Sequence, residues 1–245
     1  MPSLAKVYIA TTTALAAVIL AVVASRWNPQ HLAQFAVFFA LAMLASGMKI
    51  RLPGLKTTIS INFVFILIGM AMFSFGETVL IGLGGALVQS LWKAQQRPKA
   101  VQILFNGACL TVCTAAAFWA AHTLPSYVGA SSTVALLAVG ASVYTVLNTG
   151  LVSLVICLAE GQSMRQIWSQ CYEWTFPYFV VGAAVAGLAS GAGHSTNFGV
   201  TLLLIPMMYF VYVYYRMRIV RAVLEGISNV SQDNEPALAG STRGR

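Results

Sequence analysis

The chain alternates long apolar runs with short polar or glycine-containing connections. A helix needs roughly 20 apolar residues to cross the hydrocarbon core of a bilayer, and about 17 is the lower limit. The fourth and seventh runs are short, so we expect those two helices to begin or end at the membrane interface. The runs predict eight membrane-spanning helices: Val7–Ser25, His31–Met48, Ile59–Phe75, Thr78–Trp92, Val101–Leu124, Thr133–Leu158, Phe176–Ser190 and Asn197–Tyr215.

The distribution of basic residues gives the expected orientation. If the N-terminus is cytoplasmic, the connections on that side carry nearly all the Lys and Arg residues between the helices, whereas the outer connections carry only Arg26. This asymmetry is typical of inner-membrane proteins, whose basic loops stay on the cytoplasmic side. Merging two helices would move Lys93, Arg97 and Lys99 to the cation-poor side. We therefore predict an all-α, polytopic bundle of eight helices in the inner (plasma) membrane, with both termini cytoplasmic.

Composition supports a membrane location and changes the meaning of the net charge. Hydrophobic residues make up 58% of the 245 residues and charged residues 8%, whereas a soluble domain carries about 25% charged residues. So few charges cannot cover the surface of a water-soluble globule. The net charge of +8 would suggest a nucleic-acid partner for a soluble protein. Here the cations follow the membrane topology, so we expect the lipid bilayer as partner and no nucleic acid.

The two ends of the chain need separate interpretation. Lys6, an apolar run and "VVAS" resemble a signal peptide, but the run of about 18 residues is longer than the usual apolar region of about 7–15, so we expect a retained first helix. The last helix extends beyond the membrane and places Arg216, Arg218 and Arg221 in the cytoplasm, where we expect a signalling or coupling partner. We predict one transmembrane domain over residues 1–226 and a disordered polar tail over 227–245.

Glu77 is the one charged residue in the stretch "SINFVFILIGMAMFSFGETVLIGLGGALVQS". In one interpretation Gly76 permits a turn, and Glu77 lies at the start of the next helix, where an anion meets the positive end of the helix dipole. In the other, the carboxylate faces an outward-open cavity and binds a proton or a cationic ligand. The turn explains both Gly76 and Glu77, and we favour it while keeping the second alternative open.

Several amide side chains lie within or at the ends of the apolar runs. An amide in hydrocarbon must find a partner, so these side chains are expected to face the interior of the bundle. They either form hydrogen bonds between helices or line a pocket for a small molecule. The candidate ligand-binding residues are Asn62, Glu77, Gln89 and Asn106.

The sequence contains no recognisable catalytic or metal-binding pattern. The spacing of His31, His122 and His194 matches no ligand motif, and Cys109 and Cys113, four residues apart, are expected to serve packing. The P-loop, HExxH and GxSxG motifs are absent from the sequence. We therefore predict neither an enzyme nor a metal site, and no cofactor.

Six segments occur in an order that resembles a known kind of membrane region: "RLPG", "TTISINFVFILIG", "GETVLIGLGGALVQSLW", "RPKAVQILFN", "LNTGLVSLVICLAEG" and "WTFPYFVVGAAVAGL". The chain resembles the multi-helix membrane region at the N-terminus of bacterial signalling proteins, where it precedes HD-GYP or GGDEF enzyme domains. The resemblance implies a sensory module. After "YYRMRIVRAVLEG" this chain continues with the polar residues 227–245 instead, so we do not carry a cyclic-dinucleotide activity over to it.

The expected function is a sensory or small-ligand-binding membrane module without its own catalytic domain. Its signal would be a small helix shift near an outer pocket, transmitted along the last helix. The alternative is the substrate-binding component of a transporter. Short glycine-punctuated helices such as "ILIGMAMFSFGETVLIGLGGALVQ" resemble the substrate-binding membrane subunits of energy-coupling-factor vitamin transporters. The ligand and the oligomeric state, including a homo-oligomer, are left open.

Overall fold

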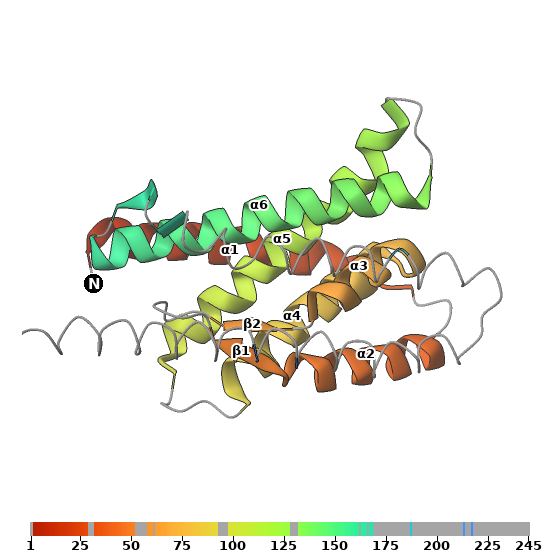
Figure 1. Cartoon of the computed structure of the whole chain (residues 1–245), viewed down its shortest axis with the longest axis horizontal. Coiled ribbons are helices and arrows are strands. Elements are labelled where there is room, and N and C mark those ends of the chain that lie inside the picture. Colours follow the sequence, from red (N-terminus) through yellow and green to blue (C-terminus); the bar gives the residue numbers. More distant parts are fainter. Residues whose placement is uncertain are drawn as a thin grey trace, which may run out of the picture.

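The computed structural model describes residues 2–28, 32–51, 58–60, 62–92, 98–127, 132–161, 163–165, 167–168, 187, 213 and 217. Within this part of the chain the fold is all-α apart from one short hairpin (Figure 1). Its elements are α1 (Ser3–Ser25), α2 (Leu32–Ser46), β1 (Lys49–Arg51), β2 (Thr58–Ser60), α3 (Asn62–Met72), α4 (Phe75–Leu91), α5 (Ala100–Tyr127) and α6 (Thr133–Glu160).

Each of the first six predicted spans overlaps one of these six helices, which confirms the all-α class. Local sequence signals set some of the ends. Ser132 caps the N-terminus of α6 with its hydroxyl, and Gly161 ends the helix in the left-handed conformation at φ 70°. The number of helices and the side of the termini stay predictions. Several expectations lie outside the described residues, apart from positions 187 and 213: the helices Phe176–Ser190 and Asn197–Tyr215, the partner expected at Arg216, Arg218 and Arg221, and the tail 227–245.

The third predicted helix, Ile59–Phe75, is wrong at its beginning. Residues 58–60 form β2, which pairs antiparallel with β1 and sets Ile50 opposite Ile59. The β-branched Thr58 and Ile59 favour this extended conformation, and the helix begins only at Asn62. With 11 residues, α3 extends for about 16 Å, roughly half the thickness of a bilayer core.

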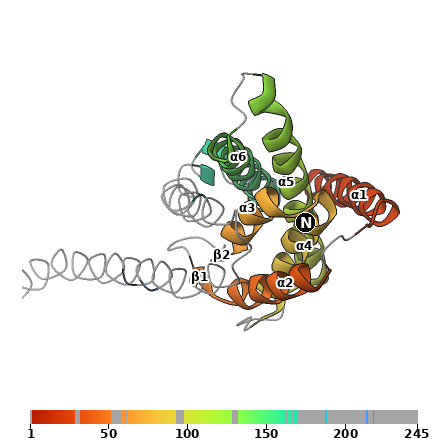
Figure 2. The ribbon, with the colours of Figure 1, turned by 90° about the vertical axis from the view of Figure 1, so that its right-hand side faces the viewer.

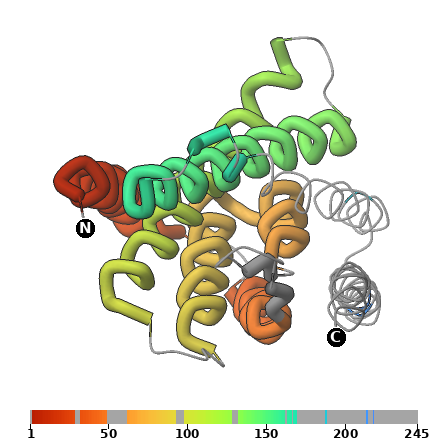
Figure 3. The backbone as a smooth tube through the Cα atoms, turned by 60° about the vertical axis from the view of Figure 1, so that its left-hand side comes forward, coloured from red at the N-terminus to blue at the C-terminus, as the bar shows by residue number. Residues whose placement is uncertain are grey.

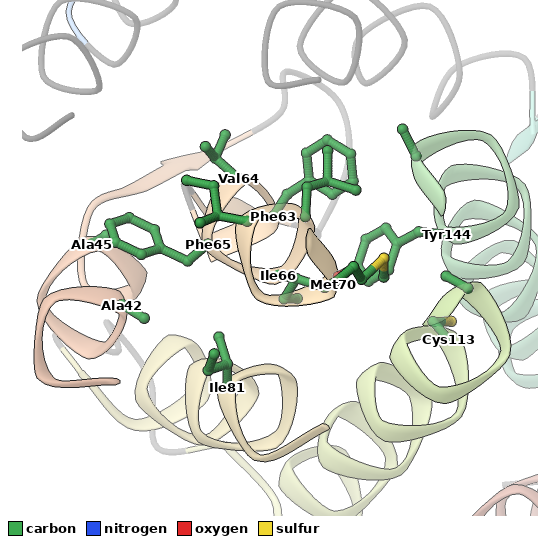
Figure 4. Packing of buried hydrophobic residues seen from close by; sticks show 14 of the residues in the cluster. Ala42, Ala45, Phe63, Val64, Phe65, Ile66, Met70, Ile81, Cys113 and Tyr144 are labelled. Atoms are coloured by element: carbon green, nitrogen blue, oxygen red, sulfur yellow. The ribbon is translucent and has the colours of Figure 1, made fainter. Parts of the chain in front are cut away.

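The short helix α3 lies at the centre of the bundle. Every side chain from Asn62 to Met70 is buried. Figure 4 shows α3 inside the hydrophobic cluster, and its aromatic side chains join it to both neighbours: the rings of Phe65 and Phe38 of α2 have centroids 5.3 Å apart, and those of Phe63 and Tyr144 of α6 are 5.1 Å apart. Helix α3 packs against α2, α4, α5 and α6, whereas α1 packs mainly against α5. Helices α2 and α4 lie on one side of the bundle and α1, α5 and α6 on the other (Figures 2 and 3).

Among the residues that the structure describes, three helices, α1, α5 and α6, are long and apolar enough to cross a membrane. The shorter helices α2, α3 and α4 are also apolar. The outer surface of α1 exposes large aliphatic side chains, among them Leu4, Val7 and Val18. An exposed apolar surface of this kind is expected where a helix contacts lipid.

Candidate functional site

A cavity of about 400 Å³ lies where the C-terminal parts of α1 and α5 meet the N-terminus of α4. Small-molecule sites usually measure about 300–1,000 Å³ and combine an apolar wall with a few polar groups. The cavity has this character. Its polar lining consists of Arg26, Asn28, Ser74, Glu77, His122 and Thr123, and its apolar lining of Val22, Val23, Trp27, Phe75, Phe118 and Trp119, with Gly76 between them.

Glu77 belongs to a capping box that begins α4. The hydroxyl of Ser74 accepts a hydrogen bond from the backbone N–H of Glu77 at 3.4 Å, and the backbone N–H of Ser74 donates to Oε2 of Glu77 at 2.9 Å. The Ser74 hydroxyl also donates to Oε2 at 2.7 Å. The carboxylate lies in the first turn, next to the positive end of the helix dipole. The predicted position of Glu77 at the start of this helix is confirmed.

The cap uses only one oxygen of the carboxylate. Glu77 is 5% exposed and lines the cavity. Among the described residues, all the hydrogen bonds to its carboxylate are accepted by Oε2. Oε1 therefore keeps its lone pairs for a group that enters the cavity. The cap and a binding role are thus compatible, although the sequence presented them as alternatives.

Gly76 does not serve the turn that the sequence suggested. It lies inside α4, and the described glycine with a positive φ is Gly161. A Cβ at Gly76 would approach Cγ1 of Val23 to 3.2 Å and the ring of Trp27 to 3.5 Å. The missing side chain therefore allows the end of α1 to pack closely against the beginning of α4, which forms one wall of the cavity.

Aromatic rings cover much of the cavity. Phe75 of α4 meets Phe118 of α5 edge to face, with centroids 5.4 Å apart, and the ring of His122 stacks on that of Phe118 with centroids 4.1 Å apart. Nδ1 of His122 lies 2.9 Å from the backbone oxygen of Phe118. Since a carbonyl oxygen only accepts, Nδ1 carries the hydrogen, and Nε2 of the neutral ring is an acceptor.

Arg26 brings a positive charge to the same cavity. It is the C-cap of α1, where its backbone N–H donates to the oxygen of Val22, and it is one of the residues that line the cavity. Neither Arg26 nor Glu77 forms an ion pair within the part of the chain that the structure describes. Sequence reasoning did not include Arg26 or His122 among the site residues. The available signal was the position of Arg26 as the lone cation of the predicted outer connections.

The other three predicted site residues lie elsewhere. Gln89 follows Glu77 by 12 positions on α4, about 18 Å along the helix axis. Asn106 of α5 donates from Nδ2 to the hydroxyl of Ser90 at 3.2 Å. None of Asn62, Gln89 and Asn106 is among the residues that line the cavity around Glu77. The structure thus separates Glu77 from the other three, whose binding role stays a prediction.

Asn62 contributes to helix packing. It is 1% exposed, and its Nδ2 donates to the backbone oxygen of Ile81 at 3.3 Å. A Cβ at Gly85 would overlap the Asn62 amide, so the glycine makes room for this contact between α3 and α4. The hydrogen bonds of Asn62 and Asn106 are the interhelical bonds that the sequence offered as one alternative. Oδ1 of Asn62 is buried without a partner among the described residues.

The described residues contain no group of three or more His, Cys, Asp or Glu side chains that could hold a metal ion. A family model, MASE9, matches residues 9–218 of the chain. No curated protein and no solved structure matches this chain.

Proposed function

We propose that this chain, which belongs to the MASE9 family of membrane-associated sensor domains, senses a small ligand that binds in the cavity around Glu77. One observation carries the proposal. Glu77 is almost fully buried, it lines a cavity of about 400 Å³, and Oε1 accepts no hydrogen bond from the described residues. Since Oε1 is not one of the fully buried side-chain atoms that lack a partner among the described residues, it is open to the cavity and free to accept a hydrogen bond. A ligand that supplies a donor would satisfy it.

The position of the cavity suggests how binding becomes a signal. Its walls come from α1, α4 and α5, three elements far apart in sequence. A ligand that contacts all three favours the arrangement in which their ends lie closest, and it shifts the population toward that arrangement by its difference in affinity. Small shifts between packed helices are a common form of such switching.

We propose that the signal is passed on at the cytoplasmic side of the membrane. We propose a multi-pass protein of the inner membrane with eight helices and both termini cytoplasmic, which puts the cavity at the outer surface. The ends of α1 and α5 and the start of α4 line one cavity, which supports helices that alternate in direction. The helix shift would pass along the last helix to a signalling partner at Arg216, Arg218 and Arg221. The proposal assigns this chain no catalytic activity of its own.

Thermal unfolding of the purified protein with a library of small metabolites tests the proposal. A ligand that binds only the folded state at a hundredfold excess over its Kd raises the free energy of unfolding by about 2.7 kcal/mol. We expect at least one such compound, and we expect Glu77→Gln to abolish its effect. The control is Glu160→Gln, the same chemical change at the far end of α6. If no compound raises the unfolding temperature, the proposal is wrong.

The alternative function, a transporter component, is separated by a flux experiment. A compound that stabilises the protein is labelled and offered to liposomes that contain it. The sensory proposal expects binding without accumulation inside the liposomes. Transport of the compound that depends on the protein would favour the transporter component.

A further inference from the structure

We infer that the ligand is a small zwitterion, with an ammonium group at Glu77 and an acidic group at Arg26. The inference rests on the proposed function, because it specifies the chemistry of the molecule that occupies the same cavity. Two residues of opposite charge, Arg26 and Glu77, line this cavity and do not pair with each other in the described residues. A molecule with both charges matches both side chains at once.

The negative end of the cavity is formed by Glu77. Its Oε2 is held by the two donors of Ser74, which fix the orientation of the carboxylate. Oε1 has no donor among the described residues. A carboxylate oxygen that is open to a cavity binds a charged donor most strongly, since charge-assisted hydrogen bonds are about twice as strong as neutral ones. An ammonium group supplies both the charge and the hydrogens.

The aromatic lining favours a cation over a metal ion or a neutral donor. Trp27 and Trp119 line the same cavity as Glu77. The face of an aromatic ring attracts an ammonium group within about 6 Å of its centroid, and Trp is the most effective ring. A hard metal ion would instead need several oxygen ligands, whereas Glu77 is the one carboxylate in the lining. The cavity therefore suits an organic ammonium group.

The positive end is formed by Arg26, which follows α1. A guanidinium group binds carboxylates and phosphates through two parallel hydrogen bonds. Arg26 is exposed at the edge of the cavity while Glu77 is buried in it. A ligand would therefore enter with its ammonium group first and leave its acid near the surface. An amine that has no acidic group would be repelled by the positive charge of Arg26. An acid that has no amino group would be repelled by the negative charge of Glu77.

Two sources carry this shared chemistry. One is a free molecule of the amino-acid class, in which a few atoms separate the ammonium group from the carboxylate. The other is the headgroup of a lipid such as phosphatidylethanolamine, in which the acid is a phosphate. Both present an ammonium group and an acid at short separation. The experiment therefore needs one arm for each source.

For the free source, the whole chain is placed in nanodiscs of phosphatidylglycerol, and thermal unfolding is measured with matched probes. The three series are alanine, ethylamine and propionate; γ-aminobutyrate, butylamine and butyrate; and phenylalanine, phenethylamine and 3-phenylpropionate. Within each series the zwitterion, the amine and the acid share nearly the same carbon skeleton. We expect a zwitterion to bind at least about tenfold more tightly than its amine and its acid, since one hydrogen bond to a charged group accounts for such a factor.

For the lipid source, the nanodiscs contain phosphatidylethanolamine in place of half of the phosphatidylglycerol. Stabilisation by this lipid, lost in Arg26→Gln, identifies the headgroup as the ligand. Stabilisation by a free zwitterion in phosphatidylglycerol alone identifies the soluble class. Either result supports the inference.

Two variants test the two charges separately. Glu77→Gln removes the negative charge but keeps an acceptor for the capping box, since Gln also serves at this position. We expect it to weaken binding of the zwitterion and of the amine by about tenfold or more. Arg26→Gln should weaken only the zwitterion and make it equal to its amine. Arg26 is exposed at a helix end, so this variant decides the inference even if Glu77→Gln does not fold.

Three results would overturn the inference. If an amine binds as tightly as its zwitterion and Arg26→Gln changes nothing, the acidic group is unnecessary, while the proposed cavity function stands. If the metabolite library yields only uncharged or acidic ligands that need Glu77, the charge assignment is wrong and the function again stands. If no probe, lipid or library compound stabilises the protein, the inference and the proposed function both fail.

Discussion

The hydroxyl of Ser74 and the charge of Glu77 should have separable effects on stability and on ligand binding. Ser74→Ala removes a side chain that accepts from the Glu77 backbone N–H and donates to Oε2 at 2.7 Å. Loss of a Ser N-cap costs about 0.5–2 kcal/mol. Glu77→Gln keeps an oxygen for the backbone N–H of Ser74, so the capping box persists. We therefore expect Ser74→Ala to lower the free energy of unfolding by more than Glu77→Gln does.

The loss of unfolding free energy in each variant can be measured as a change in unfolding temperature. For a chain of 150–250 residues, 1 kcal/mol corresponds to about 2–4 °C. Ser74→Ala should lower the midpoint by about 1–8 °C, and Glu77→Gln by less. Glu77→Gln should weaken ligand binding more than Ser74→Ala does. Ser74→Ala leaves the carboxylate in the cavity, whereas Glu77→Gln removes its charge. The assay is thermal unfolding of both variants in one lipid, with and without the ligand that stabilises the parent protein.

The reasoning is refuted by either of two results. If Ser74→Ala unfolds at the same temperature as the parent, the capping box contributes no stability. If Ser74→Ala loses ligand binding while Glu77→Gln retains it, the hydroxyl and not the carboxylate is the binding group.

Three further substitutions test the packing around α4. Gly85→Ala should cost about 1–3 kcal/mol by overpacking, because its Cβ overlaps Asn62; thermal unfolding should show a smaller cost in an Asn62→Ala background. Gly76→Ala should weaken ligand binding in a titration by pushing α1 from the cavity wall, whose nearest atom lies 3.2 Å from the added Cβ. Asn106→Ala removes one exposed hydrogen bond, so it should change the unfolding free energy by about 1 kcal/mol or less and leave ligand affinity unchanged.

The six described helices could be predicted because long apolar runs are a direct signal of membrane helices. The start of α3 could not, because the apolar and β-branched residues before Asn62 are compatible with both helix and strand, and pairing with β1 decided between them. A length of 17 residues was expected for this helix, and the structure has 11. The buried position of α3 at the centre of the bundle follows from its contacts and not from its composition.

The candidate site was predicted only in part. Glu77 was identifiable because a single charge in an apolar stretch is unusual. Arg26 was marked in the sequence only as the lone cation of the predicted outer connections, and no motif marked His122. The cavity joins three segments, near residues 22–28, 74–77 and 118–123, whose proximity depends on helix packing. Gln89 and Asn106 were grouped with Glu77 by chemical type alone. Gln89 lies 12 positions after Glu77 on α4, and Asn106 on α5 does not line the cavity either.

We propose that the cavity around Glu77 binds a small ligand through the carboxylate of this residue. The most direct test is a calorimetric titration of the best stabilising compound into the parent protein and into Glu77→Gln, both in phosphatidylglycerol nanodiscs. The account predicts saturable binding to the parent protein and a Kd at least about tenfold weaker in the variant, since a hydrogen bond to a charged group is lost. Equal affinity for the two proteins would contradict the account.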